Sequence, residues 1–250
     1  MVIATITERG ILSNKNNIVF QNYVNNKAYN LSQGTASAAT LNTITLASGA
    51  DNIYNGKVIE IIYGSGKNQA RFITGSTSLV ATVSLNWEQI PDASSVYIIH
   101  VNSGQCPEQK HNELDCYVTL DANASGIDSF YVGSFIKILH GNGKGQISEI
   151  IEYYGANKLV RLDPKLQVPA LSNSIYAIYG EGGLATSSTT STIVLDGNQS
   201  VQVGMYHYIE TIGGAAQGQV RMINSISGNT VTVNSNWETL PDNTTRYIIF

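Results

Sequence analysis

Apolar residues occur in short runs along this chain, and several of these runs alternate with polar residues at a period of two. Leu79–Leu85 alternates in this way, Val58–Tyr63 is almost continuously apolar, and Thr43–Leu46 is a shorter alternating run. Such runs predict β-strands, and no stretch has the spacing of an amphipathic helix. Glycine- and proline-containing segments between the runs predict tight turns. We therefore expect an all-β protein.

The same pattern occurs three times. A glutamine after a glycine-rich turn anchors each copy, with spacings of 77 and then 73 residues: Gln69, Gln146 and Gln219. The phrase Asn86–Asp92, NWEQIPD, returns as Asn236–Asp242, NWETLPD. The second copy lacks the arginine and tryptophan of the others and carries Ser148 and Pro164 at the positions equally distant from its glutamine, with Pro169 in place of the Pro-Asp pair.

A period of about 70–80 residues suits a small domain, because solenoid repeats run to about 20–50 residues. Each copy predicts about five short antiparallel strands, which close most economically into a small barrel or half-open sandwich. We predict three tandem antiparallel β-barrel or sandwich repeats at 36–101, 116–180 and 181–250, with a linker at 102–115. Residues 1–35 are predicted to form an extended N-terminal arm suited to adding a strand to a partner's sheet.

The composition of the chain argues against two classes of function, nucleic-acid binding and insertion into a membrane. Only 13% of the residues are charged and the net charge is −4, which argues against nucleic-acid binding because that needs a basic surface. No apolar run approaches the roughly 18 residues of a membrane span, and the first residues lack the pattern of a signal peptide. A single unit of this size buries little surface, so we expect the units to pack on one another or on neighbouring subunits.

Of the two cysteines, Cys106 lies in the predicted linker and Cys116 directly follows it. Three alternatives are open: two free thiols, which is the default, a disulfide that closes a short loop, or a metal site completed by His111 and Asp115. The spacing matches no zinc signature, which typically contains closely spaced cysteine pairs. We therefore predict no metal and no cofactor.

The glycine turns Gly64–Lys67 and Gly141–Gly145 resemble phosphate-binding loops only superficially. A phosphate loop needs a following helix whose N-terminus faces the anion, and here a strand follows. We predict hairpin turns.

The arginines after two of these turns, Arg71 and Arg221, lie near a glutamate of the preceding strand, Glu60 or Glu210. The simplest interpretation is a cross-strand ion pair or a solvated sheet face. Binding of a ligand carboxylate is the alternative.

Two loops carry the residues that we single out as candidate glycan or partner contacts: Trp87, Glu88, Asp92, Trp237, Glu238 and Asp242. An exposed tryptophan in a loop stacks on sugar rings, and neighbouring acids bind sugar hydroxyls. A tryptophan that closes the end of its own barrel is the more frequent arrangement for so large an apolar residue. The repetition of the set is explained equally well by one turn structure used twice.

No catalytic residues are predicted. None of the four histidines, His100, His111, His140 and His207, shares a repeat-equivalent position with a serine or cysteine and an acid. No pair of carboxylates of the glycosidase type is identifiable either. We therefore predict that the chain is not an enzyme.

The repeat consensus runs Tyr-x-Gly, an alternating strand, Gly-x-Gly-x-x-Gln-x-Arg-x-Ile, a valine-rich strand, Trp, Pro-Asp and a closing Tyr-x-Ile. In the first copy it is carried by Tyr54, Gly56, Gly64, Gly66, Gln69, Arg71, Ile73, Trp87, Pro91, Asp92 and Tyr97. It resembles the β-repeats of tail, fibre and minor capsid proteins of tailed phages and large DNA viruses. The resemblance covers residues 50–250, is weaker in the second copy, and transfers no catalytic site.

The resemblance implies a non-enzymatic virion structural protein, a tail, fibre, minor capsid or decoration component, assembled in the host cytoplasm. Its partners would be other virion proteins and further copies of itself, with no nucleic acid and no membrane. The alternative is a carbohydrate- or receptor-binding β-module that uses the tryptophan loops, with a glycan as its partner.

Overall fold

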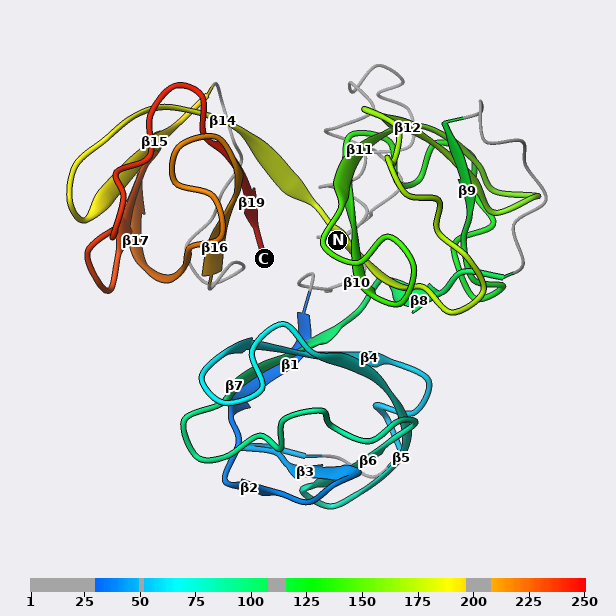
Figure 1. Cartoon of the computed structure of the whole chain (residues 1–250). Coiled ribbons are helices and arrows are strands. Elements are labelled where there is room, and N and C mark those ends of the chain that lie inside the picture. The colour runs from blue at the N-terminus through cyan, green and yellow to red at the C-terminus, as the bar shows by residue number, and fades with distance from the viewer. Residues whose placement is uncertain (1–29, 50–51, 108–115, 197–207) are drawn as a thin grey trace, which may run out of the picture.

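The computed structural model describes residues 30–49, 52–107, 116–196 and 208–250. Within these residues every regular element is a β-strand, and the strands form three antiparallel units (Figure 1). The predicted all-β fold class is therefore confirmed. No helix in the described ranges has the length and hydropathy needed to cross a membrane. The arm up to residue 29 lies outside them.

The first unit is a seven-stranded sheet with the order β1-β7-β4-β5-β6-β3-β2. Its strands are β1 (Asn30–Thr35), β2 (Ala38–Ala39), β3 (Thr43–Thr45), β4 (Val58–Tyr63), β5 (Ala70–Thr77), β6 (Val80–Val83) and β7 (Val96–His100). β1 pairs with β7, whereas β2 pairs with β3 on the other side of the unit. The opening segment therefore lies along both edges of the sheet.

The second unit is a six-stranded sheet with the order β8-β13-β10-β11-β12-β9. Its strands are β8 (Ser103–Gln105), β9 (Tyr117–Thr119), β10 (Phe135–His140), β11 (Ile147–Tyr154), β12 (Leu159–Asp163) and β13 (Ile175–Tyr179). The third unit is a closed barrel with the cyclic order β14-β15-β18-β17-β16-β19. Its strands are β14 (Glu181–Ser188), β15 (Thr192–Leu195), β16 (Tyr208–Gly213), β17 (Val220–Ser227), β18 (Thr230–Val233) and β19 (Arg246–Ile249).

Apart from the additional strand β2 of the first unit, all three units share one strand order, so the sequence repeat is also a structural repeat. The predicted strands are found, but each unit has in addition an opening strand that we did not predict. Residues 30–35 form β1 of the first unit, so the predicted arm extends too far. β8 lies inside the predicted linker and pairs with β13, so the second unit begins at Ser103.

The opening strands lack an apolar pattern for a steric reason. The backbone at Gly34 passes so close to the closing strand that an added Cβ would lie 3.1 Å from the Tyr97 hydroxyl and 2.7 Å from the Cβ of Ala47. A Cβ at Gly104 would lie 2.8 Å from the Tyr176 hydroxyl. Glycine is therefore needed where an alternating strand would carry a side chain.

Each unit has its own core inside the sheet, built from alternate residues of its strands. At the centre of each core stands the tyrosine of the closing strand, Tyr97, Tyr176 or Tyr247. The Tyr97 hydroxyl accepts a hydrogen bond from the Ala47 amide at 2.9 Å, and the Tyr176 hydroxyl accepts one from Asp121 at 2.9 Å. The tyrosine thus joins the closing strand to the loop that follows β3 in the first unit and β9 in the second.

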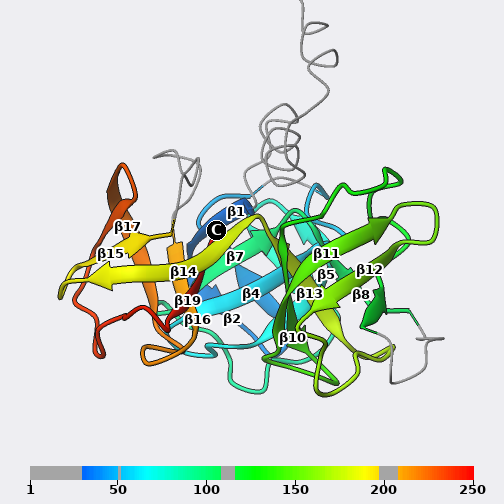
Figure 2. The same cartoon turned by 90° about the horizontal axis from the view of Figure 1, so that it is seen from above.

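A fourth core lies between the units. Figure 1 shows the three units around a common centre, and Figure 2 shows the same arrangement from above. The sheet faces that point away from the three unit cores meet there. They contribute the buried residues Val58, Ile62, Ala70, Ile98, Phe135, Leu139, Ile175, Ala177, Tyr179, Ile248 and Phe250. These residues come from repeat-equivalent positions, so the arrangement has approximate threefold symmetry. The expectation that the units pack on one another is confirmed, and we call this region the axial core.

Candidate functional site

The glycine turns are held by the anchor glutamines in the same way in every unit. The Gln69 amide nitrogen donates to Gly66 O at 3.1 Å and to Gln89 O at 2.8 Å, while its oxygen accepts from the Glu88 amide at 2.7 Å. Gln146 makes the corresponding bonds to Gly143 and Val168, and Gln219 to Ala216 and Thr239. Each glutamine therefore ties a hairpin to the loop that follows β6, β12 or β18.

The turns themselves are hairpins, as predicted. Gly64 and Gly66 have φ values of +79° and +78°, which favour glycine, and the next element is a strand. Because no helix follows, the turn has no helix N-terminus to present to a phosphate.

The two tryptophans fill the ends of their barrels. Trp87 is 2% exposed and Trp237 is 5% exposed. Their indole nitrogens donate to Thr43 O at 3.2 Å and to Thr192 O at 3.1 Å. Neither ring is open to a sugar in this structure, which agrees with the favoured expectation that each tryptophan closes the end of its own unit.

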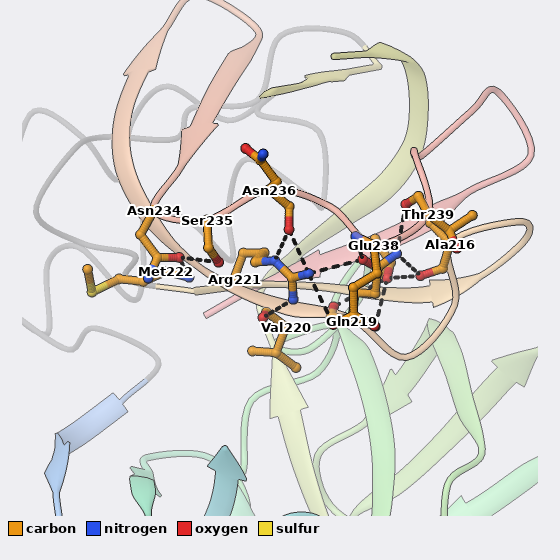
Figure 3. A network of polar contacts seen from close by, with 11 residues as sticks. Ala216, Gln219, Val220, Arg221, Met222, Asn234, Ser235, Asn236, Glu238 and Thr239 are labelled. Carbon is orange, nitrogen blue, oxygen red and sulfur yellow. Dashed lines mark hydrogen bonds and ion pairs between the residues drawn. The ribbon is translucent and has the colours of Figure 1, made fainter. Parts of the chain in front are cut away.

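An arginine covers each tryptophan. The guanidinium carbons of Arg71 and Arg221 lie 5.5 Å and 5.4 Å from the ring centroids, within the range of a cation–π contact. Figure 3 shows the Arg221 guanidinium between Gln219 and Asn236; its nitrogens donate to Asn236 O at 3.1 and 2.9 Å. Arginine, tryptophan and glutamine thus form one connected polar cap.

The expected cross-strand pairs with glutamates are not formed. Arg71 is opposite Ile59 in the register, so its side chain lies on the other face of the sheet from Glu60. Burial lowers the pKa of Arg71, an effect that Glu88 partly offsets from 3.4 Å. The side chains of Glu88 and Glu238 are 67% and 85% exposed, so these two ion pairs are weak.

The remaining candidate contacts are turn residues. Asp92 accepts hydrogen bonds from the backbone and hydroxyl of Ser94 at 2.8 and 2.6 Å, and Asp242 does the same with Thr244 at 2.9 and 2.6 Å. These bonds lower the pKa of both carboxyls. The six predicted residues therefore do not converge: the tryptophans lie inside the barrels and the acids on their surface.

The second unit closes its barrel end differently. Gln146 reaches 22 residues along the chain to Val168, whereas Gln69 reaches 20 residues to Gln89, so the second loop is two residues longer. Leu166, and not Pro164, therefore corresponds to Trp87. Leu166 packs against the core of the second unit, and the Ser148 hydroxyl donates to Pro164 O at 2.5 Å.

An ion bridge that was not predicted from the sequence lies in the axial core. Glu60, Lys137 and Glu210 all stand nine residues before their anchor glutamine. Lys137 Nζ lies 2.7 Å from Glu210 Oε2 and 3.4 Å from Glu60 Oε1, so one unit's cation bridges the acids of the other two. The alternation of acid, base and acid at one repeat position was the signal that could have revealed it.

Two further groups complete the bridge. His100 Nε2 lies 2.8 Å from Glu60 Oε2, and the Tyr179 hydroxyl donates to the same oxygen at 2.9 Å. Burial alone raises the pKa of Glu60, but Lys137, together with the bonds from His100 and Tyr179, outweighs burial and lowers it to about 2. Burial likewise opposes the charge on Lys137, and Glu210 and Glu60 outweigh it, so the pKa of Lys137 is raised. Glu60 and Lys137 therefore both retain their charge in the axial core.

Neither cysteine forms a disulfide, in agreement with the default expectation of free thiols. Burial, with a smaller effect from Asp121, raises the pKa of Cys106 to about 12, so this thiol is not a nucleophile at neutral pH. His111 and Asp115 lie outside the described residues, and the residues that are described contain no cluster able to hold a metal.

Comparisons with known protein families, with curated proteins and with solved structures find no match to this chain. The resemblance to viral β-repeats therefore stays a prediction.

Proposed function

We propose that this chain is a non-enzymatic structural component of a virus particle that acts through protein–protein contacts in an oligomeric assembly. The proposal rests on the structural roles of the polar and aromatic side chains that the repeats share. The tryptophans and arginines close barrel ends, the glutamines fasten hairpins, and the buried charges join the three units. These groups build a rigid platform, which suits an assembly component.

The surface of the platform supports the same proposal. Apolar side chains stand exposed on all three units, among them Tyr63 at 59%, Ile127 at 58% and Leu240 at 49%. Only 13% of the residues of the whole chain are charged, which suits polar and apolar contacts between proteins. In this proposal residues 1–29 supply the arm that pairs with a neighbouring copy.

Light scattering coupled to size-exclusion chromatography tests the proposal. The full chain is expected to give a mass that is a multiple of 26.9 kDa and that increases with protein concentration. Deletion of residues 1–29 is expected to lower that mass without changing the circular-dichroism spectrum of the β-fold. A mass of one chain at every concentration, with no association with purified particles in sedimentation, would overturn it.

Glycan binding is the alternative from the sequence, but no observation favours it. The exposed acids Glu88 and Glu238 remain available to a partner, whereas the adjacent tryptophans do not. A glycan array with the full chain and with Trp87→Phe, which keeps the barrel end filled, separates the alternatives.

A further inference from the structure

The seam between the second and third units differs from the seam between the first and second units. At the seam between the first and second units, Arg71 meets His140, with a guanidinium nitrogen 3.5 Å from the ring nitrogen. The residues at the corresponding positions of the next seam are Ser148 and Gly213. Two large side chains are thus replaced by small ones at the same place.

A cavity of about 280 Å³ occupies this seam. Its apolar walls include Phe135, Ile147, Leu166 and Ile212, and Ser148 lies among the polar residues that line it. A volume of this order is near the lower end of the range for small-molecule sites. The cavity adjoins a second one of about 400 Å³, which is lined by the axial ion bridge; the two share Gly145, Ile147, Ile212 and Gln217.

The charged side chains that line the seam cavity are positive. Among the described residues, Lys165 and Arg246 line it and no aspartate or glutamate does. In the described part of the chain neither cation forms an ion pair, although the protein as a whole carries a net charge of −4. The amide groups of Gln167 and Gln217 add hydrogen-bond donors to the same lining.

Arg246 is specific to the third unit. The residue before the core tyrosine is Val96 in the first unit and Ile175 in the second, and both pack against the axial core. Lys165 belongs to the loop of the second unit that is two residues longer than its counterparts. Four departures from the repeat therefore coincide at one seam: two lost side chains, one lengthened loop and one gained arginine.

We propose that this seam cavity binds a small organic anion, with a carboxylate or phosphate group between Lys165 and Arg246 and an apolar body against Phe135, Ile147 and Ile212. The charged guanidinium suits an anionic oxygen, since it donates two parallel hydrogen bonds. The apolar walls select against fully hydrated inorganic ions. The inference does not depend on the proposed role in a particle.

The test uses phenylacetate as the probe and methyl NMR of the full chain as the readout. Titration is expected to shift the isoleucine methyl signals of Ile147 and Ile212 in a saturable manner. Benzyl alcohol, which has a similar apolar body and no charge, is expected to shift them much less. Equal binding of both compounds, or no saturable shift with phenylacetate, would overturn the proposal.

Variants taken from the repeat itself sharpen the test. Arg246→Val restores the residue type of the other units and is expected to weaken phenylacetate binding about tenfold or more, because a charge-assisted contact is lost. Lys67→Gln removes one charge from the rim of the neighbouring axial cavity, where the third unit has Gln217, and is expected to leave the affinity within about twofold. Unchanged affinity in Arg246→Val, or an equal loss in both variants, would refute the site.

A filling variant covers the case in which Arg246→Val perturbs the fold. Gly213→His introduces the side chain found at the equivalent position of the second unit, and a Cβ there lies 3.6 Å from the nearest Arg246 atom, an ordinary contact. Both cations remain, yet binding is expected to be lost because the cavity is filled. Retained binding in a folded Gly213→His protein would contradict the proposed location.

Discussion

In the first and third units an arginine lies over a buried tryptophan at the end of the barrel, whereas in the second unit Ser148 and Leu166 occupy these places. The glutamine that fastens the hairpin is the same in all three. The comparison shows that the glutamine bonds define the repeat, because they satisfy backbone groups that every copy must satisfy. The residue that fills the barrel end can vary as long as the volume is filled.

The second unit also differs at the axis. Its Lys137 stands where the other units have Glu60 and Glu210, and three identical acids at this point would repel one another in the interior. The unit that departs most from the consensus therefore supplies the charge that lets three copies pack around one centre. It also contributes most of the lining of the seam cavity.

The largest effect is expected at the axis. Lys137→Met removes the cation between Glu60 and Glu210, whose side chains are 5% and 14% exposed, and is expected to lower the free energy of unfolding by about 3–5 kcal/mol, measured by urea denaturation. Arg161→Met is the matched control, since its partner Glu152 lies in a pair whose side chains are 37% and 36% exposed. The control is expected to cost about 1 kcal/mol or less. Similar losses in both variants would show that the axial bridge does not hold the units together.

The barrel ends come next. Trp237→Ala is expected to destabilise the protein by about 3–5 kcal/mol, because it opens a large cavity in a closed barrel. Leu166→Ala is expected to cost about 2 kcal/mol, because a smaller and only half-buried side chain is lost. Leu240→Ala, in the same loop but 49% exposed, should change stability by about 0.5 kcal/mol or less. If Leu166→Ala lowered the free energy of unfolding as much as Trp237→Ala, Leu166 would contribute as much stability to its unit as the tryptophan does, and the comparison between the units would be wrong.

The last prediction concerns how the stability contributed by Glu60 depends on pH. The folded pKa of Glu60, about 2, lies below its ordinary value of 4.5, so the stability that this carboxylate contributes is complete above pH 4.5 and is lost as the pH falls through 2. The difference in unfolding free energy between the parent protein and Glu60→Gln should therefore shrink as the pH falls from about 4.5 towards 2. Denaturation curves at several pH values measure this difference. A difference that stays constant over the range would contradict the assigned pKa.

The sequence alone determined the number of units, the class of fold and most strand positions. The predicted strand Val58–Tyr63 matches β4 residue for residue, because a short apolar run and the turn residues that flank it act locally. The opening strands were missed, since close approach of the backbone requires glycine at Gly34 and Gly104 and so removes the apolar signal.

The tertiary structure alone decided which side chains meet. Trp87 could have faced solvent or the core, and only the packing of the barrel settled that it is buried. Glu60, Lys137 and Glu210 are about 75 residues apart in sequence, and their contact depends on how the three units are oriented around one centre. Local patterns do not encode such contacts between units, because the outer face of a strand has the same alternation whether solvent or another barrel covers it.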